Sequence, residues 1–107
     1  MARFLVLWRL NWSAPWPTDP SKALELNETM WTGIDWLMKK GVVEEYGIFP
    51  DGASGFAIGK GEATDVFSAV SMFQPYVICE VHEIISHEKS REIMRGLMKT
   101  LIAAAKK

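Results

Sequence analysis

The sequence predicts an α+β domain with four strands and three helices. Four short runs rich in β-branched, aromatic and aliphatic residues are bounded by turn residues, and three longer segments repeat apolar residues at helical spacing. A chain of 107 residues suits one domain with one modest core. Its 49% apolar and 23% charged residues exclude a disordered chain, a fibre and a multidomain protein.

Charge and cysteine content narrow the classes of partner. Twelve basic and thirteen acidic residues give a net charge of −1, so we expect no nucleic-acid partner. The single cysteine, Cys79, excludes an internal disulfide and a cysteine-rich zinc site. The apolar run 4–8 follows Arg3 but is interrupted by Arg9 and Asn11, too early for a signal peptide or a membrane span. We therefore expect a cytoplasmic protein without a membrane partner.

The first strand and the first helix are separated by a proline-containing loop. Residues 4–10 are apolar on both alternating faces, which is typical of a central strand. Residues 11–19 contain Pro15 and Pro17 and form the loop. An N-cap at Asp19 starts a helix over 20–40, which Gly41 ends. Its apolar stripe comprises Ala23, Leu26, Met30, Ile34 and Leu37, and a second stripe of Leu24, Trp31 and Met38 is expected to widen the buried arc, with Trp31 in the core.

The second half of the chain begins with a predicted hairpin. Its strands cover 42–49 and 54–59, and Gly55 and Gly59 are expected to mark a bulge or a close approach of another backbone. A short helix over 62–73 follows, then a last strand over 76–85 and a strongly amphipathic helix from residue 86 to the end. The inner side of the short helix is expected to hold Val66, Phe67, Val70 and Phe73.

The order strand, helix, strand, strand, helix, strand is that of the ferredoxin-like βαββαβ plan, with an extra C-terminal helix at 87–107 on a core of 3–86. Two helices cover one face of that sheet, and water should select polar residues on the other face. The strands lack such alternation. We therefore expect a homodimer, or a higher homo-oligomer, whose open sheet faces pack around a cavity as a dimeric α+β barrel. The last helix is expected to dock on its own or the partner protomer.

The run Phe73-Gln74-Pro75-Tyr76-Val77-Ile78-Cys79-Glu80-Val81, after a short helix and within the last strand, resembles the corresponding stretch of muconolactone isomerases and related dimeric α+β barrel proteins. With the element order, the similarity covers roughly residues 3–86. The resemblance implies a ferredoxin-like protomer that dimerises through its sheets. The superfamily includes isomerases, cofactor-free monooxygenases and haem enzymes, and no catalytic residue is carried over from it. The C-terminal helix departs from the isomerase pattern.

Glu80 and His82 are the candidate catalytic residues. They lie two apart on one strand and therefore on one face, so they can act as an acid and base pair on an organic substrate in the dimer cavity. The alternative is a solvated or hydrogen-bonded pair at the barrel rim. Glu83 points to the opposite face and His87 starts the next helix, so no metal site is predicted. No cofactor is expected.

Further side chains are candidates for ligand binding. Arg9 and Asn11 share a face of the first strand and can supply an anion contact and an amide, while Phe4, Val6, Trp8 and Leu10 are expected to pack on the helices. Tyr46, with Glu44, can join from the second strand. The remaining candidates are Tyr76, Trp12 and Trp16, the two tryptophans as a lid or a dimer contact.

Three functions remain open at this point. The first is a non-catalytic homodimer that binds a small apolar or aromatic organic ligand, between sheet and helices or between the two sheets, with Glu80, His82 and Arg9 as its polar groups. The second is a cofactor-free isomerase or monooxygenase with His82 as the general base. The third is a purely structural or interaction module without a cavity.

Overall fold

The computed structural model describes residues 2–106, which form four strands and three helices. The elements are β1 (Ala2–Leu10), α1 (Pro20–Lys39), β2 (Val43–Ile48), β3 (Ser54–Gly61), α2 (Ala63–Ser71), β4 (Val77–Ile84) and α3 (His87–Ala105). The predicted α+β class and the order of the elements are confirmed.

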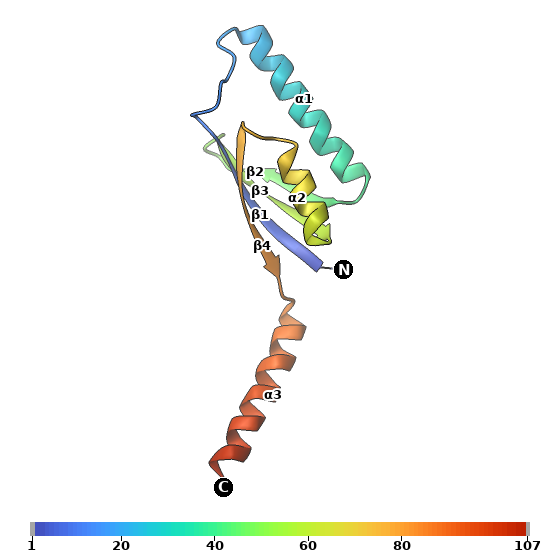
Figure 1. The fold of residues 1–107 in the computed structure, drawn as a ribbon, viewed down its shortest axis with the longest axis vertical. Coiled ribbons are helices and arrows are strands. Elements are labelled where there is room, and N and C mark those ends of the chain that lie inside the picture. Colours follow the sequence, from blue (N-terminus) through green and yellow to red (C-terminus); the bar gives the residue numbers. More distant parts are fainter. Residues whose placement is uncertain (1, 107) are drawn as a thin grey trace.

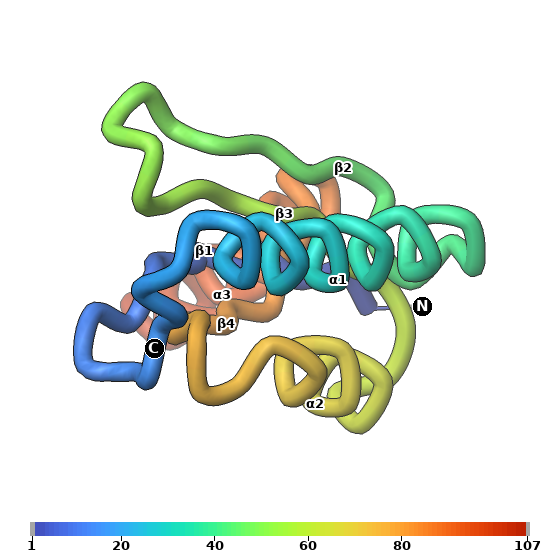
Figure 2. The backbone as a smooth tube through the Cα atoms, turned by 90° about the horizontal axis from the view of Figure 1, so that it is seen from above, coloured from blue at the N-terminus to red at the C-terminus, as the bar shows by residue number. Residues whose placement is uncertain are grey.

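The four strands form one open antiparallel sheet in the order β2-β3-β1-β4. Helices α1 and α2 lie on the same face of this sheet, while α3 continues beyond the end of β4 (Figure 1). Seen from above, α1 and α2 lie side by side and the β2–β3 hairpin projects beyond α1 (Figure 2). The sheet therefore has one face covered by helices and one open face.

Strand β1 lies in the middle and supplies the core. Phe4, Val6 and Trp8 are buried on the helix-covered face, as the sequence predicts. Leu5 and Leu7 alternate with them and lie on the open face, where they remain partly exposed. The open face is thus apolar along its central strand.

The ends of α1 follow their predicted signals. The backbone N–H of Ser21 donates to Asp19 Oδ1 (3.1 Å), Pro20 occupies the first turn, and Gly41 adopts φ = 80° just after the helix. The second stripe is a correction. Trp31 is 50% exposed, and Leu24 and Met38 are exposed as well, because no element covers this flank of α1.

The hairpin is held by its turn and by a close approach at Gly55. Asp51 Oδ1 accepts from the backbone N–H of Ala53 (2.9 Å) and of Ser54 (3.1 Å). A Cβ atom at Gly55 would collide with the Trp8 ring and with the carbonyl oxygen of Gly47, so the predicted close approach is confirmed.

A β-bulge interrupts the pairing of β2 with β3. The register shifts between Val43 and Glu45, which pair with the consecutive residues Gly59 and Ile58. Glu44 is the extra residue, and its Oε1 accepts from Arg3 Nε (3.2 Å). A bulge changes the phase with which later side chains alternate, and this decides where Tyr46 lies.

Helix α2 is shorter than predicted and buries fewer residues. Val66 and Ala69 are buried, but Phe67 is 70% exposed, which corrects its placement on the inner side. The residue after Val66 is turned by about 100° around the helix axis, so Phe67 points away from the sheet.

Candidate functional site

A cavity of about 230 Å³ lies between the sheet and the helices. Its wall combines residues of all four strands with residues of α1 and α2. Most lining side chains are apolar, and they include Val6, Trp8, Ile34, Ala57, Val70 and Phe73. This hollow is therefore a place where an apolar molecule can be removed from water.

The floor of the cavity carries an aromatic pair. Trp8 and Tyr46 stack with ring centroids 5.5 Å apart and an interplanar angle of 3°. Trp8 is buried, and its Nε1 is the buried side-chain nitrogen without a hydrogen-bond partner among the described residues. A buried indole N–H normally has an acceptor, so this donor is a free polar group in a residue that lines the cavity.

Tyr46 and Cys79 are the titratable groups of the cavity wall. Burial, and next the nearby Cys79, raise the pKa of the Tyr46 hydroxyl above its usual value. Burial also raises the pKa of the Cys79 thiol. Both groups are therefore neutral at pH 7, and the cavity wall offers a hydroxyl, a thiol and the Asn27 amide but no charged group.

Glu80 and His82 meet on the other side of the sheet. Glu80 Oε2 lies 2.7 Å from His82 Nε2, so the two candidate catalytic residues are in direct contact. They pair with Leu7 and Leu5 of β1, which puts them on the open face. Both side chains are exposed in the protomer. The pair is thus separated from the cavity by the sheet.

Arg9 shares the open face with Glu80, whereas Asn11 lies in the loop before α1. Arg9 pairs with Ile78, two residues from Glu80. Asn11 follows the end of β1, where its amide Nδ2 donates to the carbonyl oxygen of Pro75 (2.9 Å) and its Oδ1 accepts from the backbone N–H of Ser13 (3.1 Å). The Asn11 side chain therefore ties the loop before α1 to the segment that precedes β4.

The aromatic candidates fall into two groups. Tyr46 lies on the helix-covered face, so its expected grouping with Glu80 and His82 is wrong. Tyr76 and Trp16 pack against each other with centroids 4.9 Å apart, and Trp16 Nε1 donates to the carbonyl oxygen of Asn11 (2.6 Å). Trp12 is 73% exposed. Trp16 and Tyr76 therefore secure the loop before α1, and none of the three residues lines the cavity.

Sequence reasoning missed the residues that make the cavity. It assigned Trp8 and Cys79 to plain packing, and it treated Tyr46 as a partner of the open face. The available signal was the small size of Ala57, Gly59 and Ala69, which line the hollow on strand and helix positions where larger residues would fill it. Composition alone does not distinguish such a hollow from a packed core.

Residues 2–106 include no cluster of three or more His, Cys, Asp or Glu side chains placed to hold a metal ion. In the same range, each helix is too short or too polar to cross a lipid bilayer. The candidate sites within residues 2–106 are therefore the cavity and the Glu80–His82 pair.

No model of a known protein family matches the chain, and no curated protein matches its sequence. The similarity to dimeric α+β barrel proteins thus rests on residues 73–81 and on the order of the elements.

Proposed function

We propose that this chain is the protomer of a homodimer that binds a small apolar or aromatic organic molecule in the cavity between the sheet and the helices. The cavity itself is the observation that carries the proposal. Its volume of about 230 Å³ exceeds the roughly 150 Å³ of an engineered apolar cavity that admits benzene. A molecule with a single ring and a short substituent fits this space.

The polar groups of the wall define the chemistry of the ligand. The Tyr46 hydroxyl, which burial keeps protonated, lines the cavity together with the Asn27 amide, whose Nδ2 donates to the carbonyl oxygen of Ala23 (3.0 Å). The Tyr46 hydroxyl is a hydrogen-bond donor, so a ligand with a carbonyl or ether oxygen is favoured over a hydrocarbon of the same shape. An anion is disfavoured, because the wall holds no positive charge to balance it.

The homodimer is proposed to be a dimeric α+β barrel of ferredoxin-like protomers. The chain contains two β-α-β units, β1-α1-β2 and β3-α2-β4. In the sheet, β3 lies between the strands of the first unit and β1 lies between the strands of the second unit. The open face presents Leu5, Leu7, Phe56 and Ile78 to solvent in the lone protomer. Pairing of two open faces removes this apolar surface from water.

A second candidate function is a cofactor-free isomerase or monooxygenase in which His82 is the general base. The observation that favours it is the 2.7 Å contact between Glu80 Oε2 and His82 Nε2 on an apolar sheet face. A carboxylate that holds one ring nitrogen fixes the orientation of the imidazole, as a general base requires. In a sheet-paired dimer the pair would lie at the interface, where a substrate between the sheets can reach it.

Ligand binding is tested by thermal shift with acetophenone as the probe and ethylbenzene as its apolar match. We expect the melting temperature of the wild-type protein to rise with both, and more with acetophenone. Val70→Phe fills the cavity and should abolish the shift, because Val70 lines it. Val81→Phe is the matched control, since Val81 is exposed and lies outside the lining. Equal shifts in the two variants would contradict the site.

The second candidate is tested separately through His82. Replacement of His82 by Asn keeps a polar group of similar size and removes the base. If the open face is catalytic, turnover of an accepted substrate falls about a hundredfold or more, whereas ligand-induced stabilisation through the cavity is unchanged. Unchanged turnover in His82→Asn would exclude His82 as the base.

A further inference from the structure

Helix α3 carries an apolar stripe that no other element of residues 2–106 covers. Its six large apolar side chains are each between 50 and 55% exposed, and they comprise Ile93, Met94, Leu97, Met98, Leu101 and Ile102. The helix has no buried residue. An amphipathic helix of this kind is stable when its stripe is buried against another element.

The whole protomer is too extended for a lone globular subunit. Its accessible surface is 7924 Å², whereas a compact protein of this mass exposes about 6,000 Å². Its radius of gyration is 19.3 Å, against about 13 Å for a compact chain of this length. The excess surface is of the size that one subunit buries in a stable complex.

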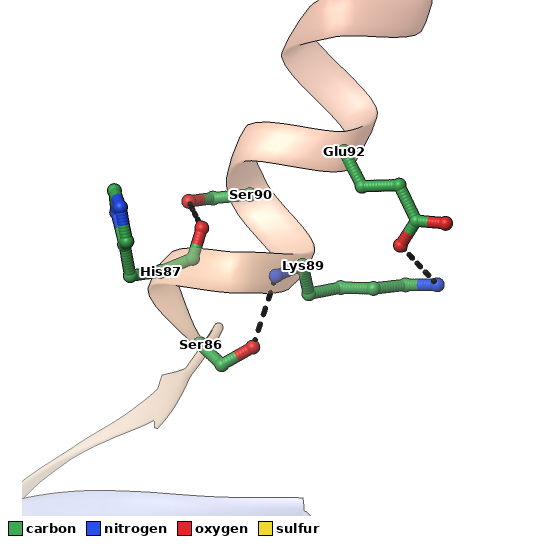
Figure 3. A network of polar contacts seen from close by, with 5 residues as sticks. All are labelled: Ser86, His87, Lys89, Ser90 and Glu92. Atoms are coloured by element: carbon green, nitrogen blue, oxygen red, sulfur yellow. Dashed lines mark hydrogen bonds and ion pairs between the residues drawn. The ribbon is translucent and has the colours of Figure 1, made fainter.

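The start of α3 fixes its direction away from the sheet. Only Ile85 and Ser86 separate β4 from the helix, and Ser86 Oγ accepts from the backbone N–H of Lys89 (3.1 Å) as the N-cap. Lys89 Nζ lies 3.6 Å from Glu92 Oε2 in the same first turns (Figure 3). Helix α1 lies over one face of the sheet, whereas α3 extends beyond the end of β4 (Figure 1). The α3 stripe is therefore not packed on the α1 of its own chain.

Helix α1 carries a second uncovered stripe. Leu24, Trp31 and Met38 are seven residues apart, so they follow one line along the helix. All three are exposed, and Trp31 also lines the edge of the cavity. On the opposite flank, a Cβ atom at Gly33 would touch Met72 and Phe73. The α2 region thus covers one flank of α1 and leaves the α1 stripe open.

The two stripes have complementary charged borders. At 3.6 residues per turn, Glu28 and Asp35 follow the α1 stripe by about 40–60° around the axis. Arg91 and Arg95 follow the α3 stripe in the same rotational sense by about 70–110°. All four are exposed, and none takes part in an ion pair within residues 2–106. The acidic border of α1 and the basic border of α3 are thus displaced from their stripes in the same rotational sense. When two such stripes pack face to face, these borders lie on the same side of the contact only if the helices are antiparallel.

We propose that α3 of one copy packs antiparallel on the α1 stripe of a second copy. In this arrangement the charges match along the seam, with Arg95 opposite Glu28, Arg91 opposite Asp35 and Glu88 opposite Lys39. Helices α1 and α3 run in the same general direction along the molecule (Figure 1). A twofold axis across the long axis reverses the second copy, so both α3 helices reach an α1 stripe at once.

The area of this contact is sufficient for a specific interface. When the two stripes are buried, every one of their side chains removes roughly 80 Å² of apolar surface from water. Two symmetric copies of the α1–α3 contact therefore bury more than about 1,200 Å², which is the lower end for stable protein complexes. This contact is separate from the open sheet face and does not depend on the proposed pairing of sheets.

The test measures self-association of the full-length protein by sedimentation equilibrium. Leu97→Glu places a charge in the α3 stripe and should weaken association at least about tenfold. Lys99→Glu introduces the same side chain on the opposite arc of α3, and association should remain within about twofold. A monomeric wild-type protein, or equal effects of the two variants, would overturn the proposal.

A charge exchange identifies α1 as the partner surface. Arg91→Glu combined with Arg95→Glu should weaken association, because two like-charge contacts form with Asp35 and Glu28. Adding Glu28→Arg and Asp35→Arg to the same chain should restore it, since the opposite charges meet again. If the variant with all four substitutions associates no more tightly than the variant with only the two arginine substitutions, α3 does not pack on α1.

Discussion

Trp8 reaches across Gly55 and stacks on Tyr46, with the two ring planes within 3° of parallel. Trp8 belongs to β1, Tyr46 to β2, and Gly55 lies on β3 between them. A side chain at position 55 would hold the indole away from the sheet. This three-strand contact therefore sets the floor of the cavity.

Gly55→Ala should destabilise the fold by roughly 1–3 kcal/mol, because its Cβ would overlap the Trp8 ring and the Gly47 carbonyl oxygen. Gly96→Ala is the matched control. A Cβ at Gly96 in α3 meets nothing within 4 Å, so this change should stabilise the helix by about 0.5–1 kcal/mol. Chemical denaturation of both variants measures the difference, and destabilisation of the same size in both would refute the stacking account.

Stability should fall at alkaline pH through Tyr46 and Cys79. Burial raises the pKa of both groups, so the folded state holds their protons more tightly than the unfolded state. The folded state keeps its full stability below the ordinary pKa of a thiol, about 8.5. It loses the contribution of these two groups as the pH rises through their raised pKa values. Denaturant titrations between pH 7 and pH 11 should show a shallower alkaline decline in Tyr46→Phe than in wild type. An identical decline would show that Tyr46 stays accessible to water.

The hairpin turn should lose stability in acid. Hydrogen bonds from the Ala53 backbone N–H, and next from the Ser54 side chain, lower the pKa of Asp51. Because the pKa is lowered in the folded state, ionised Asp51 stabilises the fold at pH values above the usual pKa of an aspartate. This stabilisation is lost as the pH falls through the lowered pKa. Asp51→Asn should therefore reduce stability at pH 7 and flatten its decline in acid. Parallel acid limbs for the two proteins would contradict this role.

The N-cap of α3 should control fraying of its first turn. Ser86→Ala removes the acceptor of the Lys89 N–H, which costs a helix about 1 kcal/mol and corresponds to roughly fivefold faster exchange of its first amides. Ser90→Ala is the control, because the Ser90 hydroxyl only donates to the His87 carbonyl oxygen within the helix. Hydrogen exchange followed by NMR gives both rates, and equal rates would exclude capping by Ser86.

Local signals in the sequence were enough to locate the elements. Asp19 and Gly41 bound α1 as predicted, because capping and left-handed backbone depend on a few neighbouring residues. Burial was predicted less well. Trp31 and Phe67 have apolar side chains at helical spacing, yet both are exposed, since burial depends on which distant element covers a flank.

Only part of the candidate site could be predicted, because it too depends both on local alternation and on distant elements. Alternation along β4 correctly places Glu80 and His82 together. Along β2 the same rule groups Glu44 with Tyr46, but the bulge between Val43 and Glu45 changes the phase, so Tyr46 lies under the helices. The cavity results from the packing of several elements around small residues, and one strand's pattern does not reveal it.

The molar mass of the wild-type protein in solution at micromolar concentration, measured by light scattering with small-angle X-ray scattering on the same sample, tests the central claim most directly. Two uncovered apolar surfaces, the open sheet face and the α3 stripe, require at least twice the 12.1 kDa of one chain. A well-folded species of 12.1 kDa with a radius of gyration of about 13 Å would contradict the account, because one chain would then shield both surfaces alone.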